Sequence, residues 1–188
     1  IEPESGHVLH RVEVGKTAAD LTFDGEKIYV ANFDSSSLSV IDKNDFSVSE
    51  MAAGEQPLKL CACAGKVYVL DHAGNRLIEV GGKSHELPTT GLPDNIFEWH
   101  GKLVITSHSN DRLHITNLDP GSGLLEFLYT LEYPYGDTRF DSGNVSFYLR
   151  GQFGDALFSI TRGKTDASGR LWISDFLSGR VFILSGSR

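Results

Sequence analysis

Four stretches of this chain align with one another without a gap. Each has a basic residue, a short apolar run, a polar turn and a second apolar run, and the four are Lys27–Ile41, Lys66–Val80, Lys102–Thr116 and Arg170–Leu184. Such a repeat indicates a fold that stacks copies of one supersecondary unit. Because two short apolar runs flank a polar turn, each copy is predicted to contain a β-hairpin.

Two more strands are predicted to flank each hairpin. A short apolar segment that ends in a turn precedes the first three hairpins, at residues 19–23, 58–62 and 95–99. An outer segment follows them, at residues 48–51, 85–87 and 126–131. Four antiparallel strands per copy make up the blade of a β-propeller, in which the sheets are arranged radially around a central channel. We therefore expect an all-β chain, with residues 1–188 in a single propeller domain.

The two ends of the chain are predicted to meet. The last copy stops after its third strand at Leu184, and Val8–Val14 is an apolar segment without an assigned partner. Because an open sheet edge is a liability, Val8–Val14 is predicted to supply the missing outer strand and close the ring. Two alternatives stay open, in which a second chain completes the ring or the repeats belong to a larger propeller.

The segment Tyr133–Lys164 separates the third copy from the fourth and has no counterpart between the other copies. Within it, Ser146–Ile160 fits the hairpin pattern and would make a degenerate fifth blade. The alternative is an insertion into a chain of four repeats. Since insertions in repeat proteins usually lie in loops on one face, often the binding face, we expect Tyr133–Lys164 to contribute to contact with a partner.

Two of the repeats resemble known propeller families of bacteria and archaea. Ile28–Asp42 (IYVANFDSSSLSVID) is similar to the repeats of YVTN-type propellers, and Val67–Val80 (VYVLDHAGNRLIEV) is similar to those of NHL-type propellers. The resemblance covers nearly the whole chain except Tyr133–Lys164, and it implies the architecture. It leaves the activity open, because such propellers include scaffolds, cell-surface proteins, sensor domains and enzymes.

A narrower resemblance lies at Gly91–Ile96 (GLPDNI). The hexapeptide resembles the start of an inner strand in calcium-dependent lactonases and strictosidine-synthase-like hydrolases, which are six-bladed propellers. In that family the asparagine lies on the central axis and ligates the metal, which implies Asn95, with Asp94, as Ca²⁺ ligands here. The other markers of the family, an acidic residue before Gly-Pro and a second Pro-Asn-Gly segment, are not recognisable in this sequence.

Asp20, Lys59 and Asn95 occupy equivalent positions near the start of the predicted inner strands. Oxygen ligands from different blades could surround a Ca²⁺ ion, which takes six to eight oxygens. Lys59 opposes this interpretation, because its positive charge would instead pair with Asp20 or bind a substrate anion. The simpler alternative is a set of polar groups that line the channel and are hydrated.

The turns inside the hairpins carry a second set of candidate residues. His72 and His108 are equivalent, and Asp71 and Asp175 precede the same position in their copies. Neutral imidazoles bind transition metals and carry protons, so these histidines with Asp71 or Asp175 would make a mixed site. The alternative is that the acidic residues are ordinary hydrogen-bonding turn residues.

A third set consists of arginines just before the last strand of each hairpin. They are Arg76, Arg112 and Arg180, with Ser37 in the first copy. Arginines repeated from blade to blade are expected to bond to turn carbonyls or to carboxylates such as Asp71 and Asp175. This set is therefore interpreted as structural.

Composition narrows the choice of partner and location. The chain has a formal net charge of −8, and an acidic surface repels phosphate backbones, so nucleic acid is not an expected partner. No apolar run approaches the ~18 residues of a membrane-spanning helix. The first residue is Ile1 and not Met, which fits either a removed export leader or a piece of a longer chain. We favour an extracytoplasmic location over a cytoplasmic one.

The two cysteines, Cys61 and Cys63, are separated by one residue. Side chains two apart in a strand point to the same face, but the rise of the strand places their sulfur atoms poorly for a disulfide. A metal site would need further His or Cys ligands, which the neighbouring sequence lacks. We expect two small core residues.

These observations favour a non-catalytic binding or scaffold module that presents a loop face to a protein or a small-molecule ligand. The alternative is a calcium-dependent, lactonase-like hydrolase. In that case Asn95, Asp94 and Asp20 would hold Ca²⁺ in the channel, and His72 or His108 would carry protons. Ca²⁺ is the only cofactor that the sequence suggests.

Overall fold

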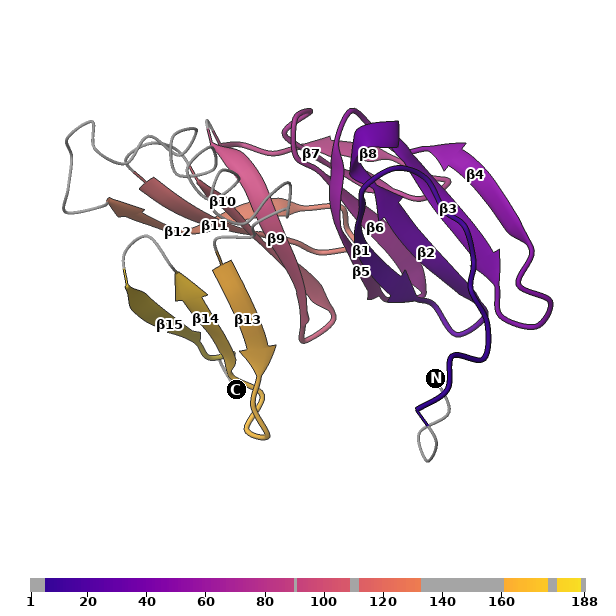
Figure 1. Ribbon diagram of the computed structural model, residues 1–188. Coiled ribbons are helices and arrows are strands. Elements are labelled where there is room, and N and C mark those ends of the chain that lie inside the picture. The colour runs from indigo at the N-terminus through magenta and orange to yellow at the C-terminus, as the bar shows by residue number, and fades with distance from the viewer. Residues whose placement is uncertain (1–5, 90, 109–111, 133–160, 176–178, 187–188) are drawn as a thin grey trace.

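The computed structural model describes residues 6–89, 91–108, 112–132, 161–175 and 179–186. These residues fold into four antiparallel sheets, with a single 3-10 turn (Phe33–Ser35) as their helical content. In each sheet the strands are neighbours in the order in which they follow one another along the chain (Figure 1). This is the meander of a propeller blade, and the predicted all-β, multi-blade architecture is confirmed.

The four sheets are called blades 1 to 4 in chain order. Blade 1 contains β1 (Ala18–Phe23), β2 (Lys27–Asn32), β3 (Ser37–Asp42) and β4 (Val48–Ala52). Blade 2 contains β5 (Pro57–Cys63), β6 (Lys66–Asp71), β7 (Arg76–Glu79) and β8 (Ser84–Glu86). Blade 3 contains β9 (Leu92–Trp99), β10 (Lys102–His108), β11 (Arg112–Leu118) and β12 (Leu125–Glu132). Blade 4 contains β13 (Thr161–Thr165), β14 (Leu171–Asp175) and β15 (Arg180–Leu184).

The strands predicted from the repeat are all present, and β13 is added to them. β13 pairs with β14, from Thr161 opposite Asp175 to Thr165 opposite Leu171. Its sequence, Thr-Arg-Gly-Lys-Thr, has no apolar residue, so it lacks the alternation by which a strand is recognised. The strand is instead held by its partners. The rest of the segment considered as an insertion or a fifth blade, residues 133–160, lies outside the described residues.

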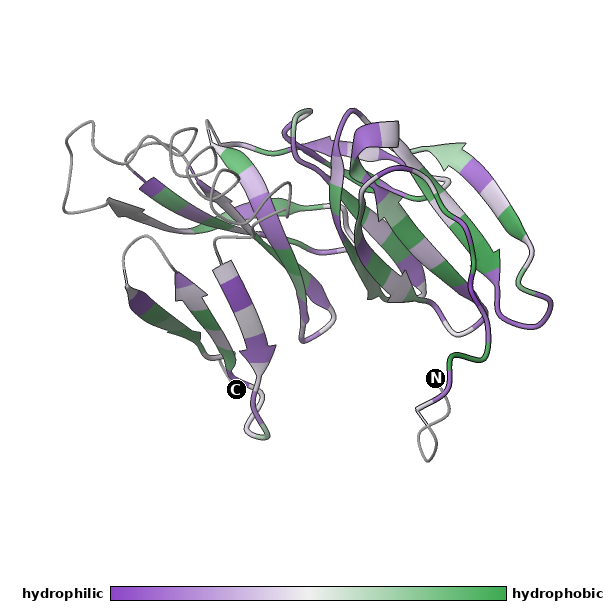
Figure 2. Ribbon diagram, viewed as in Figure 1, coloured by the Kyte–Doolittle hydropathy of each residue, from purple (hydrophilic) through white to green (hydrophobic). Residues whose placement is uncertain are grey.

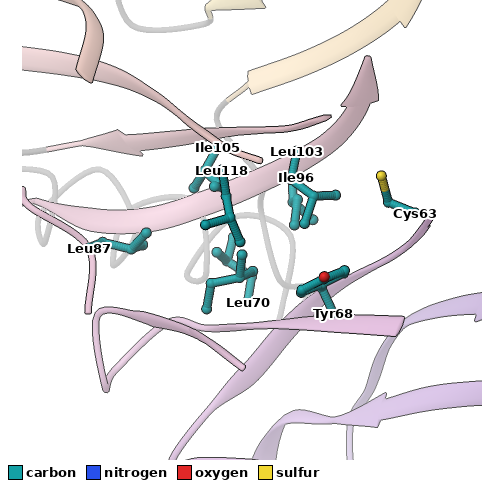
Figure 3. Close-up of a cluster of buried hydrophobic side chains, with 9 residues drawn as sticks. Cys63, Tyr68, Leu70, Leu87, Ile96, Leu103, Ile105 and Leu118 are labelled. Atoms are coloured by element: carbon teal, nitrogen blue, oxygen red, sulfur yellow. The ribbon is translucent and has the colours of Figure 1, made fainter. Parts of the chain in front are cut away.

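Apolar side chains from facing sheets fill the spaces between consecutive blades. The core between blades 2 and 3 brings Tyr68 and Leu70 against Ile96, Leu103 and Ile105 (Figure 3). Similar clusters lie between blades 1 and 2, around Leu38 and Val69, and between blades 3 and 4, around Leu113 and Ile173. Burial of each such side chain contributes roughly 1.5–3 kcal/mol. In Figure 2 the apolar residues lie along the strands of the blades. Each blade therefore depends on its neighbours for a core.

The predicted closing strand Val8–Val14 is not formed. These residues contain no strand and lie beside blade 1, where the His10 ring stacks on Phe46 with centroids 4.4 Å apart. The amide of Gly15 then donates to Ser39 Oγ of β3 at 3.3 Å. Because only Gly15–Thr17 connect this segment to β1, these local contacts hold it on the first blade. Among the described residues, blade 4 has three strands, with β15 at its edge.

The inner strands β1, β5, β9 and β13 contact one another in sequence, whereas no comparable contact joins β13 back to β1. Closure of the ring is thus not seen among the described strands. Nor do those residues include a helix of the length and apolar character needed to cross a membrane.

Both cysteines are free thiols, with Cys63 buried and Cys61 partly buried. Cys63 belongs to the core between blades 2 and 3, and Cys61 packs against it. Burial, with smaller contributions from Cys63 and Glu98, raises the pKa of Cys61 to about 12. A thiol with so high a pKa stays protonated and unreactive at neutral pH. This agrees with the predicted role as core residues.

Candidate functional site

Asp71, at the end of β6, is fully buried and accepts hydrogen bonds from three directions. The amides of Glu55 and Gln56, in the link from blade 1, donate to it at 3.1 and 2.9 Å. Gly74 N in the turn donates at 3.3 Å, and Arg76 Nε of β7 forms an ion pair at 2.9 Å. A buried carboxylate is tolerated only with such partners. Asp71 therefore ties the link, the turn and β7 together, as expected for the arginine set.

Two glycines leave room for this carboxylate. A Cβ at Gly54 or at Gly74 would overlap the Oδ2 atom of Asp71. Gly54 also has a φ of +93°, a conformation that favours glycine. Gly15 is equivalent to Gly54 in the first repeat, and its Cβ would overlap the side chain of Asn32. The sequence analysis did not single out Gly15 and Gly54, although a glycine recurs at the same position of both repeats.

In blade 1 the place of Asp71 is taken by Asn32, and the place of Arg76 by Ser37. Asn32 Nδ2 donates to Ser37 Oγ at 3.2 Å and to Ser39 Oγ at 2.9 Å. A buried ion pair is thus replaced by a neutral amide with hydroxyl partners, which avoids an unpaired buried charge. Asn32 thus bonds to β3, whereas Asp71 also holds the link from the preceding blade.

His108, at the end of β10, lies buried between two carboxylates from different strands. Its Nδ1 is 3.2 Å from Asp94 Oδ1 on β9, and its Nε2 is 3.4 Å from Asp175 Oδ1 on β14. The side chains of all three residues are almost completely buried. The structure therefore brings His108 and Asp175, which the sequence suggested as parts of one mixed site, together with Asp94, which it suggested as a calcium ligand.

The charges in this cluster stabilise one another. Burial by itself would lower the pKa of His108, but the charges and contacts of Asp94 and Asp175 outweigh it and raise the pKa to about 9. Burial by itself would raise the pKa of Asp94, but His108, Thr106 and Thr161 lower it to about 2. At neutral pH the cluster therefore contains an imidazolium between two carboxylates.

Asp94 and Asn95 also connect the inner strands of blades 3 and 4. The Asp94 carboxylate accepts from Thr106 Oγ1 at 2.7 Å and from the amide of Thr161 at 2.9 Å. Asn95 Nδ2 donates to the carbonyl of Thr161 at 2.8 Å, while its Oδ1 accepts from Ile96 N at 3.0 Å. Thr106 and Thr161 were missed by sequence reasoning, because nothing in the sequence assigned a strand to Thr161.

The predicted calcium ligands are distributed over two blade junctions. Asp20 Oδ2 accepts from the amide of Leu60 at 3.0 Å and so joins β1 to β5, whereas Asp94 and Asn95 join β9 to β13. Among the described residues, no group of three or more His, Cys, Asp or Glu side chains is placed to hold a metal ion. In this structure the oxygens of Asp94 accept from Thr106 and Thr161 and lie beside His108.

Lys59 lies on β5 next to Leu60, but within the described part of the chain it forms no ion pair with Asp20.

His72 and His108 occupy equivalent positions but have different partners. The Nδ1–H of His72 donates to the carbonyl of Pro93 on β9 at 2.7 Å, since a carbonyl can only accept. Its ring is tilted against Phe33, the equivalent residue of blade 1, with centroids 6.3 Å apart. No described contact joins His72 to Asp71 or to His108. Among the described residues, a histidine and acidic residues of these sets come together where blades 3 and 4 meet, at His108, Asp94 and Asp175.

Comparison with known proteins identifies the fold. No protein-family model and no curated protein sequence matches this chain. A functionally unknown protein from Desulfotomaculum acetoxidans matches with a TM-score of 0.59 and 13% identity, over 92% of this chain and 56% of that one. A candidate 6-phosphogluconolactonase from Bacteroides uniformis matches with a TM-score of 0.56 and 12% identity. The match covers 88% of this chain and 49% of that one. An auxiliary nutrient binding protein from Bacteroides thetaiotaomicron matches with a TM-score of 0.54 and 14% identity. The match covers 93% of this chain and 43% of that one.

This chain therefore spans about half the length of the solved structures that it resembles. At such identities the likeness concerns the fold alone. Together with the four antiparallel sheets and the series of contacting inner strands, it establishes a β-propeller architecture for the chain.

Proposed function

We propose that this chain is a non-catalytic β-propeller module that binds a ligand at its loop end. The loop end consists of the 3-10 turn at Phe33–Ser35 in blade 1, the turn at residues 72–75 in blade 2 and the link at residues 53–56, with Glu55, Gln56 and His72 among its residues. The proposal rests on the burial and the hydrogen bonds of the candidate catalytic groups. Asp71, Asp94 and His108 are buried and engaged by partners within the protein, whereas a general base must reach the substrate.

The same contacts make the loop end a suitable binding surface. Asp71 holds the link at Glu55 and Gln56 against the turn that contains Gly74. Loops fixed in this way can present exposed side chains without a large loss of conformational entropy on binding. Ligand-binding residues are commonly found on loops that a rigid scaffold positions.

A soluble small molecule or a protein is the proposed partner, in a compartment outside the cytoplasm. The net charge of −8 disfavours nucleic acid. The fold is shared with an auxiliary nutrient binding protein and with a candidate 6-phosphogluconolactonase, so the fold is compatible with binding and with hydrolysis. We favour binding over hydrolysis because Asp71 and Asp94 are hydrogen-bonded to partners within the protein.

A thermal-shift screen tests the binding proposal. Monosaccharides, oligosaccharides and amino acids are added singly, and a ligand at 100 times its Kd should stabilise the fold by about 2.7 kcal/mol. Glu55→Ala should weaken the shift, because Glu55 is exposed at the loop end. Glu26→Ala is the matched control, since Glu26 is exposed in the turn between β1 and β2 at the opposite end. A shift lost equally in both variants would place the ligand elsewhere.

The second candidate is a calcium-dependent, lactonase-like hydrolase. It is favoured by one observation, that Asp94 and Asn95 do lie on an inner strand. Lactone hydrolysis and the melting temperature are measured with and without Ca²⁺. We expect no turnover and no Ca²⁺-dependent shift, because the Asp94 oxygens are taken by Thr106, Thr161 and His108. Ca²⁺-dependent turnover that Asn95→Ala abolishes would replace the binding proposal by this one.

A further inference from the structure

We draw no further inference here: the strongest candidate, the apolar outer face of blade 4 around Trp172, Val181 and Ile183, carries none because nothing in the structure shows what covers it.

Discussion

At the scale of the residue, one position per blade determines how the loop end is built. Asp71 in blade 2 and Asn32 in blade 1 stand at the same point of the repeat and bond to different side chains. The charged residue has Arg76 and three backbone amides around it, and the neutral one has two serine hydroxyls. Both oxygens of Asp71 have partners, whereas Asn32 Oδ1 is buried without a hydrogen-bond partner among the described residues.

Replacement of Gly54 by Ala tests the space beside Asp71. The new Cβ would overlap the carboxylate, so the link or Asp71 must move and hydrogen bonds are lost. Gly25→Ala is the matched control, because Gly25 has a φ of +108° and open space around it. We expect Gly54→Ala to lower the free energy of unfolding by about 2 kcal/mol more than Gly25→Ala, measured by urea denaturation. Equal losses would show that only backbone strain matters at Gly54.

His108→Gln tests the charged cluster through its pH dependence. Because folding raises the pKa of His108 from 6.5 to about 9, its contribution is complete below pH 6.5 and is lost as the pH rises through 9. The lowered pKa of Asp94 predicts a second loss as the pH falls from 3.8 toward 2. The variant should lose about 3 kcal/mol at pH 6, because Asp94 and Asp175 keep their buried charge without the imidazolium.

The free energy of unfolding, measured between pH 6 and 10, checks this prediction. The wild-type curve should fall across the range, and the curve of the variant should be nearly flat. Parallel curves for the two proteins would mean that His108 is neutral in the folded state.

At the scale of the element, blade 4 is the least supported of the four. Its described part has three strands, and its inner strand β13 lacks apolar residues. Its attachment to blade 3 combines the cluster around Leu113 and Ile173 with the bonds that Thr161 forms to Asp94 and Asn95. Blades 2 and 3, in contrast, are packed on both faces.

Hydrogen exchange should reveal this difference. Amides of β13–β15 are expected to exchange faster than those of β5–β7, because an end blade can open without disturbing two interfaces. Thr161→Val, which removes a hydroxyl near Asp94 and keeps the shape, should lower the stability of the attachment by about 1–3 kcal/mol. Mass spectrometry of the exchanged protein should then show faster exchange in β13–β15 and no change in β1–β4. A uniform increase over all blades would contradict independent opening.

At the scale of the whole molecule, the described blades follow one another in a series in which each packs against its neighbours. In such series the stability is a sum of unit and interface terms, so the weakest end unfolds first. The two tryptophans report on one junction, because Trp99 Nε1 donates to the carbonyl of Gly169 across blades 3 and 4 and Trp172 lies in blade 4.

Unfolding by urea should therefore depend on the probe. Tryptophan fluorescence is expected to change at a lower urea concentration than far-UV circular dichroism, which averages over all the strands. Coincident transitions for the two probes would indicate a single cooperative unit.

Much of the fold was predictable, because a blade is a local structure. Each hairpin joins strands that are a few residues apart, and the repeat marks both strands and the turn. The prediction was wrong for Val8–Val14, which has the composition of a strand but is held beside blade 1 by Phe46 and Ser39. It was incomplete for β13, whose polar sequence has no strand pattern.

The sequence by itself determined that this protein consists of repeated antiparallel blades, because alternation and turn chemistry act over short distances along the chain. Only the tertiary structure decided what the candidate site residues do. Asp94 meets Thr161 at a separation of 67 residues, and His108 meets Asp175 at the same separation. Such contacts depend on how two blades pack against each other, and packing decided that His108 lies between Asp94 and Asp175 and that Asp94 bonds to Thr161.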